Sequence, residues 1–184
     1  LGYGVFKNCT NLSSVTINGN IGDCNDRSID WPSEERSVFY NAGTNTTSLK
    51  VTFGSSVTRI PAYIFATDSS KSDGNYVHIT SLVIPSSVTE IGSYAFWNCY
   101  DLRSITWGEN LKTIETYAFY NNIALKSVSL PSKTTSLEAY AFEGCTGITT
   151  VTLPKATKNL GYGVFKNCTN LSSVTINGNI GDCN

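Results

Sequence analysis

Six cysteines are the side chains of this sequence with the widest chemical range, since a thiol can act as a nucleophile, bind a metal or form a disulfide. Four of them share one position, three residues after a recurring phenylalanine: Cys9, Cys99, Cys145 and Cys168. This regular placement predicts a column of buried structural thiols. Cys145 and Cys168 would lie close enough for a disulfide, but parallel side-chain directions in neighbouring repeats fit that bond poorly.

The remaining two cysteines, Cys24 and Cys183, lie outside this column. They are the candidates for reactivity or intermolecular pairing. The sequence has no Cys-x-x-Cys pair and no Cys/His cluster, so it predicts no zinc site and no cofactor.

Acid–base and hydrolytic chemistry have little support in this sequence. The single histidine, His78, is not paired with a serine or cysteine by any motif, and catalysis needs a positioned acid, base or nucleophile. Glu34 and Glu35 are interpreted as a solvated pair. The segment that begins at Asp68 is similar to a calcium-binding loop, but it lacks a glycine at its sixth position and an acidic residue at its twelfth, where Ile79 stands. We therefore expect neither an enzyme nor a metal site.

An internal repeat organises the chain. Residues 81–103, 104–126, 127–149 and 150–172 align without a gap as 23-residue units. One phenylalanine marks each repeat, and the series is Phe6, Phe39, Phe65, Phe96, Phe119, Phe142 and Phe165. The first three intervals are longer and carry insertions within residues 18–37, 41–48 and 67–78. Seven repeats, the last incomplete, therefore form one domain over residues 1–184. Because the sequence opens inside a repeat, we expect it to be a piece of a longer polypeptide.

The repeat predicts short strands and tight turns. Alternation in Ser127-Val128-Ser129-Leu130 is typical of a strand with one buried face, and proline or glycine ends each such run. The segment from Ser93 to Asn98 is too short for a lasting helix and suits one helical turn. A single coil cannot bury its apolar side alone, so stacked coils predict a mostly β solenoid.

Residues 81–103, SLVIPSSVTEIGSYAFWNCYDLR, resemble the leucine-rich repeats of the BspA-like (Treponema-type) class almost letter for letter. The resemblance covers residues 51–184 well, and residues 1–50 only through the phenylalanine turns. It implies a curved right-handed superhelix with a parallel concave sheet and short helical turns opposite. It also implies a secreted or cell-surface protein of bacteria or parasitic protists that adheres to host proteins.

Composition agrees with an extracellular repeat protein. The net charge of -1 gives no electrostatic footprint for nucleic acid, and no apolar run is long enough to span a membrane. We therefore expect a protein ligand on a host or neighbouring cell, no nucleic acid and no membrane insertion.

Three surfaces are candidate binding sites. The outward strand positions would form a hydroxyl face: Ser104, Thr106, Ser127, Ser129, Thr150 and Thr152. A tyrosine column lies two residues before the phenylalanine: Tyr63, Tyr94, Tyr117 and Tyr140. The insertions would form a lobe that carries Trp31, Tyr76 and His78, and this lobe is the first choice for specificity. The alternatives are a face that is polar only for solubility and tyrosines that only stack between coils.

A second, exact repetition is separate from the 23-residue unit. Residues 1–25 recur unchanged as residues 160–184. Either the parent protein contains tandem 159-residue blocks, or the chain was extended to cap or polymerise the solenoid. In both cases we expect head-to-tail association through uncapped ends. Two functions stay open, an adhesin segment that binds protein and a structural spacer that holds other domains away from a cell surface.

Overall fold

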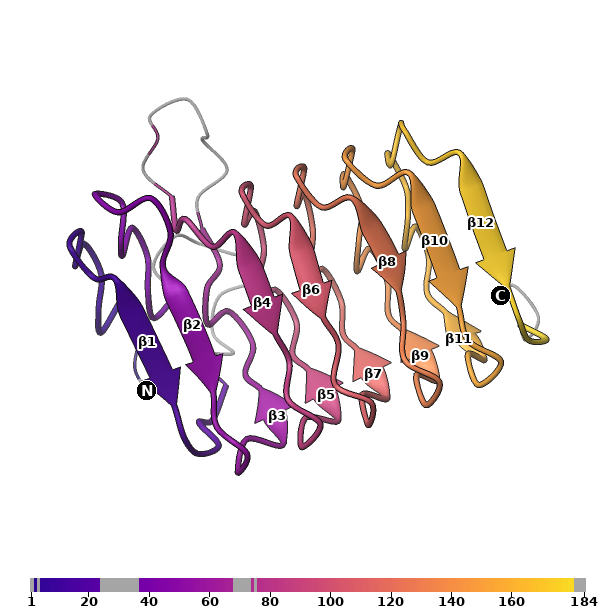
Figure 1. Ribbon diagram of the computed structural model, residues 1–184, viewed down its shortest axis with the longest axis horizontal. Coiled ribbons are helices and arrows are strands. Elements are labelled where there is room, and N and C mark those ends of the chain that lie inside the picture. Colours follow the sequence, from indigo (N-terminus) through magenta and orange to yellow (C-terminus); the bar gives the residue numbers. More distant parts are fainter. Residues whose placement is uncertain (1, 3, 24–36, 68–73, 75, 181–184) are drawn as a thin grey trace.

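Stacked coils run along the long axis of the protein, and each gives one strand to a front row (Figure 1). This computed structural model describes residues 2, 4–23, 37–67, 74 and 76–180. The front row consists of β1 (Ser14–Ile17), β2 (Lys50–Phe53), β4 (Ser81–Val83), β6 (Ser104–Thr106), β8 (Ser127–Ser129), β10 (Thr150–Leu153) and β12 (Ser173–Ile176). The back row consists of β3 (Arg59–Ile60), β5 (Glu90–Ile91), β7 (Thr113–Ile114), β9 (Ser136–Leu137) and β11 (Asn159–Leu160).

All strand pairs are parallel, and their register follows the repeat. Val151 of β10 lies opposite Val128 of β8 and Val174 of β12, each 23 residues away. The back row forms one five-stranded sheet, whereas the front row divides into three hydrogen-bonded sheets, β1–β2, β4–β6 and β8–β10–β12. Inward residues such as Val128 and Val151 are buried while their strand neighbours face outward. The structure thus confirms the predicted β solenoid.

The turns opposite the front row differ from the predicted helical turn, because the described residues contain no helix. Tyr94 and Asn98 have positive φ angles of 59° and 58°. The amide of Phe96 donates to the Ala118 carbonyl of the next coil at 2.8 Å, whereas the amide of Ala95 closes a turn to Gly92 at 3.2 Å. Alternate amides therefore bond between coils and within the coil, and a helix would need them all within one coil.

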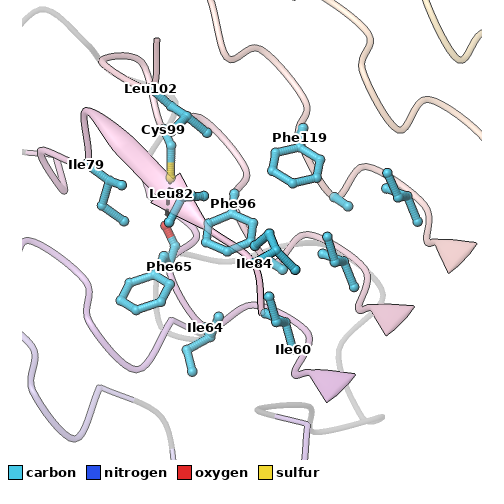
Figure 2. Close-up of a cluster of buried hydrophobic side chains, with 14 of the residues drawn as sticks. Ile60, Ile64, Phe65, Ile79, Leu82, Ile84, Phe96, Cys99, Leu102 and Phe119 are labelled. Atoms are coloured by element: carbon cyan, nitrogen blue, oxygen red, sulfur yellow. Dashed lines mark hydrogen bonds between the residues drawn. The ribbon is translucent and has the colours of Figure 1, made fainter. Parts of the chain in front are cut away.

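The marker phenylalanines stack as a continuous ladder through the core. Successive ring centroids lie 5.0 to 5.8 Å apart from Phe6 to Phe165, with interplanar angles of 5° to 17°. Figure 2 shows Phe65, Phe96 and Phe119 within this core, between the aliphatic side chains of both strand rows. Phe39, Phe65, Phe96, Phe119 and Phe142 are buried.

The two ends of the ladder, and of the cysteine column predicted to be buried, are less buried than the middle. Phe6 is 37% exposed and Phe165 is only partly buried, because each has a coil on one side alone among the described residues. Cys9 is exposed for the same reason. Cys99, Cys145 and Cys168 are buried, and their thiols donate to the carbonyl of the marker phenylalanine in the preceding coil at 3.1 to 3.5 Å. Asn122 takes this position in one coil and donates to Phe96 at 2.9 Å.

Candidate binding surfaces

The outer face of the front row is a neutral surface of hydroxyl groups. Ser104, Thr106, Ser127, Ser129 and Thr150 are exposed, and Thr152 is partly exposed. Their strands pair in register, so Thr150 lies beside Ser127 and Thr152 beside Ser129. The strand period turns these short side chains to one face because alternate residues point away from the core. Each hydroxyl can donate and accept a hydrogen bond, so the face suits polar contacts without charge pairing.

A groove interrupts this face between β2 and β4. Its volume is about 320 Å³, and its lining includes Lys50, Thr52, Ser81, Val83 and Pro85. No ladder hydrogen bond joins β2 to β4 in the described residues, and the insertion within residues 67–78 lies between them in the sequence. Val83 is 62% exposed at the groove. A partner bound in this groove would bury the Val83 side chain and form hydrogen bonds with the lysine and the hydroxyl groups beside it.

The predicted tyrosine column forms a stacked ribbon. Tyr63, Tyr94, Tyr117 and Tyr140 stack at successive centroid distances of 4.7, 5.0 and 4.8 Å. Tyr63 is buried, which corrects its assignment as a binding residue, and the other three are partly exposed. Burial, with a smaller contribution from Tyr140, raises the pKa of Tyr117. The ribbon therefore offers ring edges rather than open ring faces to a partner.

Other aromatic residues, which were not among the residues predicted from the sequence, widen this ribbon. Trp97 lies at 90° to Tyr94, and Tyr120 packs edge-on against Tyr117. Tyr162 is exposed and meets the edge of Tyr140 at 5.3 Å. Trp97 and Tyr120 both follow the marker phenylalanine directly, so their shared position was a usable signal.

Tyr76 and His78, the two candidate residues of the predicted lobe that the structure describes, both lie against the coil that follows. Tyr76 is buried, which corrects its assignment as a presented contact residue. Its ring packs edge-on against Tyr100 at 5.2 Å, and its hydroxyl donates to Asp101 at 3.4 Å. His78 is partly exposed, and its Nδ1 lies 2.6 Å from the same aspartate. Asp101 thus holds both side chains against the coil that follows the insertion. Trp31, Glu34, Glu35, Asp68, Cys24 and Cys183 lie outside the described residues.

The buried thiols have raised pKa values and therefore low reactivity. Burial raises the pKa of Cys168 to about 11, and it raises the pKa values of Cys99 and Cys145 as well. A thiol held protonated is a poor nucleophile and a poor metal ligand. Over the ranges that the structure describes, no three His, Cys, Asp or Glu side chains gather where they could hold a metal ion.

A charge cluster spans the start of the back row. Arg59 of β3 forms ion pairs with Asp23, Glu90 and Glu115. Burial lowers the pKa of Arg59, but the hydrogen bonds that its guanidinium donates to Glu90, Asp23 and Glu115 outweigh this effect and raise the pKa on balance. The guanidinium is thus the counter-ion of three carboxylates, and it ties Asp23 to three back-row coils.

Parallel coils, a phenylalanine ladder and a buried Cys/Asn column that bonds the backbone define a leucine-rich-repeat solenoid. The chain belongs to the BspA type leucine rich repeat region family, whose model matches residues 1–72 and 74–184 in six copies. No curated protein sequence matches the chain. Within the described residues, no helix has the length and apolar character needed to cross a bilayer.

Several bacterial structures are similar. A leucine-rich repeat protein from Bacteroides ovatus is 36% identical over 53% of this chain and 25% of its own, with a TM-score of 0.50. The T. pallidum leucine rich repeat protein is 28% identical over 65% of this chain and 52% of its own, with a TM-score of 0.58. A leucine rich cell surface protein from Faecalibacterium prausnitzii shares the fold at 21% identity over 97% of this chain and 63% of its own, with a TM-score of 0.53. The chain spans less than two thirds of each of these proteins.

Proposed function

We propose that this chain is a non-enzymatic protein-binding module of an extracellular or cell-surface protein, and that it works as a segment of an adhesin. The observation that carries the proposal is the groove between β2 and β4, where the exposed Val83 lies among hydroxyl groups and Lys50. A surface that combines one apolar anchor with hydroxyl groups and a lysine suits an extended protein segment. The cell-surface protein of F. prausnitzii that shares the fold is consistent with this location.

The hydroxyl face extends the groove over the neighbouring coils. Solenoid proteins use such continuous faces to bind elongated partners, because each coil adds similar contact groups at a regular spacing. Strands in a sheet lie about 4.8 Å apart, so the hydroxyl groups of neighbouring coils recur at a regular spacing across the face. Trp31 stays a further candidate contact in the insertion between residues 18 and 37.

The test measures capture of solubilised extracellular-matrix protein by the immobilised chain. Val83→Lys should lower capture at least tenfold if the groove is the contact surface, because the lysine replaces the apolar anchor. Ser132→Lys adds the same charge to an exposed residue away from the front row and should leave capture unchanged. Trp31→Ala tests in the same assay whether the insertion within residues 18–37 contributes to capture. Equal capture by wild type and Val83→Lys would overturn the assignment to the groove.

A spacer is the second candidate function. The uniform 23-residue coils from Ser81 to Ser172 favour it, because a spacer needs only regular stacking. In that case wild type and all variants should capture no matrix protein, although the fold stays intact by circular dichroism. Saturable capture that Val83→Lys abolishes would exclude a pure spacer.

A further inference from the structure

Three consecutive loops form a basic edge inside the solenoid. The loops that join β6 to β7, β8 to β9 and β10 to β11 follow one another along one end of the front strands (Figure 1). They comprise residues 108–112, 131–135 and 154–158, and their charged residues are Glu109, Lys112, Lys133, Lys155 and Lys158. Four lysines and one glutamate therefore give this edge a clear excess of positive charge, although the whole chain has a net charge of -1.

The repeat places these lysines close together. Lys112 and Lys158 occupy the same repeat position two coils apart, with Thr135 at that position in the coil between them. The Lys112 carbonyl accepts from the Thr135 amide, and the Thr135 carbonyl accepts from the Lys158 amide, both at 2.9 Å. Since neighbouring strands lie about 4.8 Å apart, the backbones of Lys112 and Lys158 lie about 10 Å apart. Lys133 and Lys155 come from two adjacent coils of the same set.

The backbone beneath the lysines is held in place by buried hydroxyl groups. The hydroxyl of Thr134 donates to the Leu111 carbonyl of the preceding loop, and the hydroxyl of Thr157 donates to the Thr134 carbonyl, both at 3.1 Å. Pro131 and Pro154 restrict the backbone where two of these loops begin. A preformed edge of this kind loses little conformational entropy when a partner binds.

The lysine charges are accessible to a partner. Lys112, Lys133, Lys155 and Lys158 are all exposed. Among the described residues none of the four forms an ion pair, and neither does Glu109. Four cations without an ion pair in three adjacent coils produce a positive field that attracts an anionic partner.

The residue types of the basic edge favour sulfate groups over nucleobases. The three loops contain lysine but no arginine, so they offer point charges rather than the planar fork that pairs with carboxylates and guanine. They also contain no aromatic side chain on which a base could stack. The hydroxyl groups of Ser132 and Thr135 accompany the lysines and can donate hydrogen bonds to anionic oxygen atoms.

We propose that the basic edge binds a linear sulfated polysaccharide. The polysaccharide crosses the three loops along the solenoid axis, because the lysines come from successive coils, and its sulfate groups pair with their ammonium groups. The basic edge lies at the ends of β6, β8 and β10, whereas the proposed groove lies between β2 and β4. This inference is therefore independent of the proposed function.

The test is isothermal titration of the full chain with a heparin oligosaccharide in about 0.15 M salt, where the Debye length of about 8 Å screens distant charges. Lys133→Gln/Lys155→Gln should weaken binding at least tenfold, because a lysine near an anionic surface is worth about fivefold in affinity. Arg103→Gln/Lys126→Gln is the matched control. It removes the same charge from two exposed residues at the opposite end of the front strands, and it should bind like wild type.

An added charge should have the converse effect. Ser132→Lys places a fifth lysine on the basic edge, at the repeat position of Lys155, and should tighten heparin binding about fivefold. Matrix protein freed of sulfated polysaccharide tests the groove alone, and its capture should not change with Ser132→Lys. The two proposals can therefore fail separately.

Unchanged thermal unfolding of each variant shows that its fold is intact. Wild type that does not bind heparin, or equal losses in the two double variants, would overturn the proposal. Equal binding of heparin from which the sulfate groups have been removed would overturn the role of sulfate. Duplex DNA that binds as tightly as heparin would overturn the assignment to a polysaccharide.

Discussion

The rings of Phe119 and Phe142 stack with their centroids 5.2 Å apart and their planes 5° from parallel. Both rings are buried, and Trp107 closes the side of Phe119 with an edge contact at 5.6 Å. Phe119 also stacks on Phe96 at 5.2 Å. Each ring in the middle of the ladder therefore supports the coils on both sides of it.

Replacing Phe119 by alanine should destabilise several coils together. The cavity lies between two stacked rings, and such changes cost about 3–5 kcal/mol of unfolding free energy. Phe165→Ala should cost less, because Phe165 is partly exposed and stacks on Phe142 alone among the described residues. Urea unfolding of both variants measures the difference. Equal losses at the two positions would contradict the stacking account.

A second prediction concerns the backbone conformation of the tyrosine ribbon. Tyr117 has a φ of 56°, a conformation that costs non-glycine residues about 1–2 kcal/mol. Tyr117→Gly and Tyr117→Ala lose the same ring contacts, but glycine releases the strain. We expect the glycine variant to be the more stable of the two by roughly 0.5–1 kcal/mol, after the larger chain entropy of unfolded glycine is subtracted.

Tyr120 provides the control for this comparison, because it packs against Tyr117 without a positive φ. At Tyr120 the usual order should return, with alanine more stable than glycine. Thermal unfolding of the four variants measures both orders. The same order at both positions would show that strain at Tyr117 is not what separates them.

Thiol labelling tests the environment of the cysteine column. In a Cys24→Ser/Cys183→Ser background, the exposed Cys9 should react first with a thiol reagent near pH 8. Cys168, whose pKa burial raises to about 11, should follow slowly, and Cys99 and Cys145 should react only on unfolding. Mass spectrometry of labelled peptides gives the order. Labelling of Cys145 as fast as Cys9 in the native protein would contradict its burial.

Much of the fold could be predicted because one constraint recurs in every coil. Phe96 and Phe119 occupy the same inward position 23 residues apart, and the spacing of their repeats sets the strand register. The turn conformation could not be predicted in the same way. The segment around Tyr94, considered alone, is compatible with a helical turn. In the structure its alternate amides donate to the neighbouring coil, and this interaction between repeats replaces the helical hydrogen bonds.

The candidate sites were less predictable because burial depends on residues far away in the sequence. Tyr76 resembles an exposed loop aromatic, but Tyr100 and Asp101 of the next repeat cover it. The groove beside Val83 lies between β2 and β4, which no ladder hydrogen bond joins in the described residues, and no local residue pattern encodes that gap. The partners of Arg59 come from three separate coils, so no short motif contains them.

The carboxylate of Glu115 makes the acid stability of the solenoid predictable. Its Oε2 accepts hydrogen bonds from the amide and the hydroxyl of Ser93 at 2.8 and 2.9 Å, and its Oε1 accepts from Arg59 at 2.9 Å. Burial raises the pKa of Glu115, but hydrogen bonds from Glu90, Arg59 and Ser93 and the charge of Arg59 outweigh it and lower the pKa. The pKa of Glu90 is raised, chiefly by its hydrogen bond with Glu115.

The direction of the shift fixes the pH window. The pKa of Glu115 is lower in the folded protein than its unfolded value of about 4.3, so the unfolded state binds more protons between the two values. Its contribution is therefore complete above about pH 4.3 and is lost as the pH falls through the folded pKa. The pKa of Glu90 is raised in the folded protein, so its ionisation lowers the unfolding free energy at neutral pH. This unfavourable contribution disappears as Glu90 is protonated at lower pH.

Glu115→Gln should lower the unfolding free energy by about 1–2 kcal/mol at pH 7, because the charged acceptor is lost from two partners. The gap between wild type and Glu115→Gln should shrink as the pH falls below about 4.3, since wild type then loses the same charge. Urea unfolding at a series of pH values measures this gap. Ser93→Ala removes one donor to Glu115. It should therefore lower the unfolding free energy at pH 7 by less than Glu115→Gln does, and this loss should also shrink below about pH 4.3. A gap that stays constant from neutral to acidic pH would show that the charge on Glu115 is not what stabilises these coils.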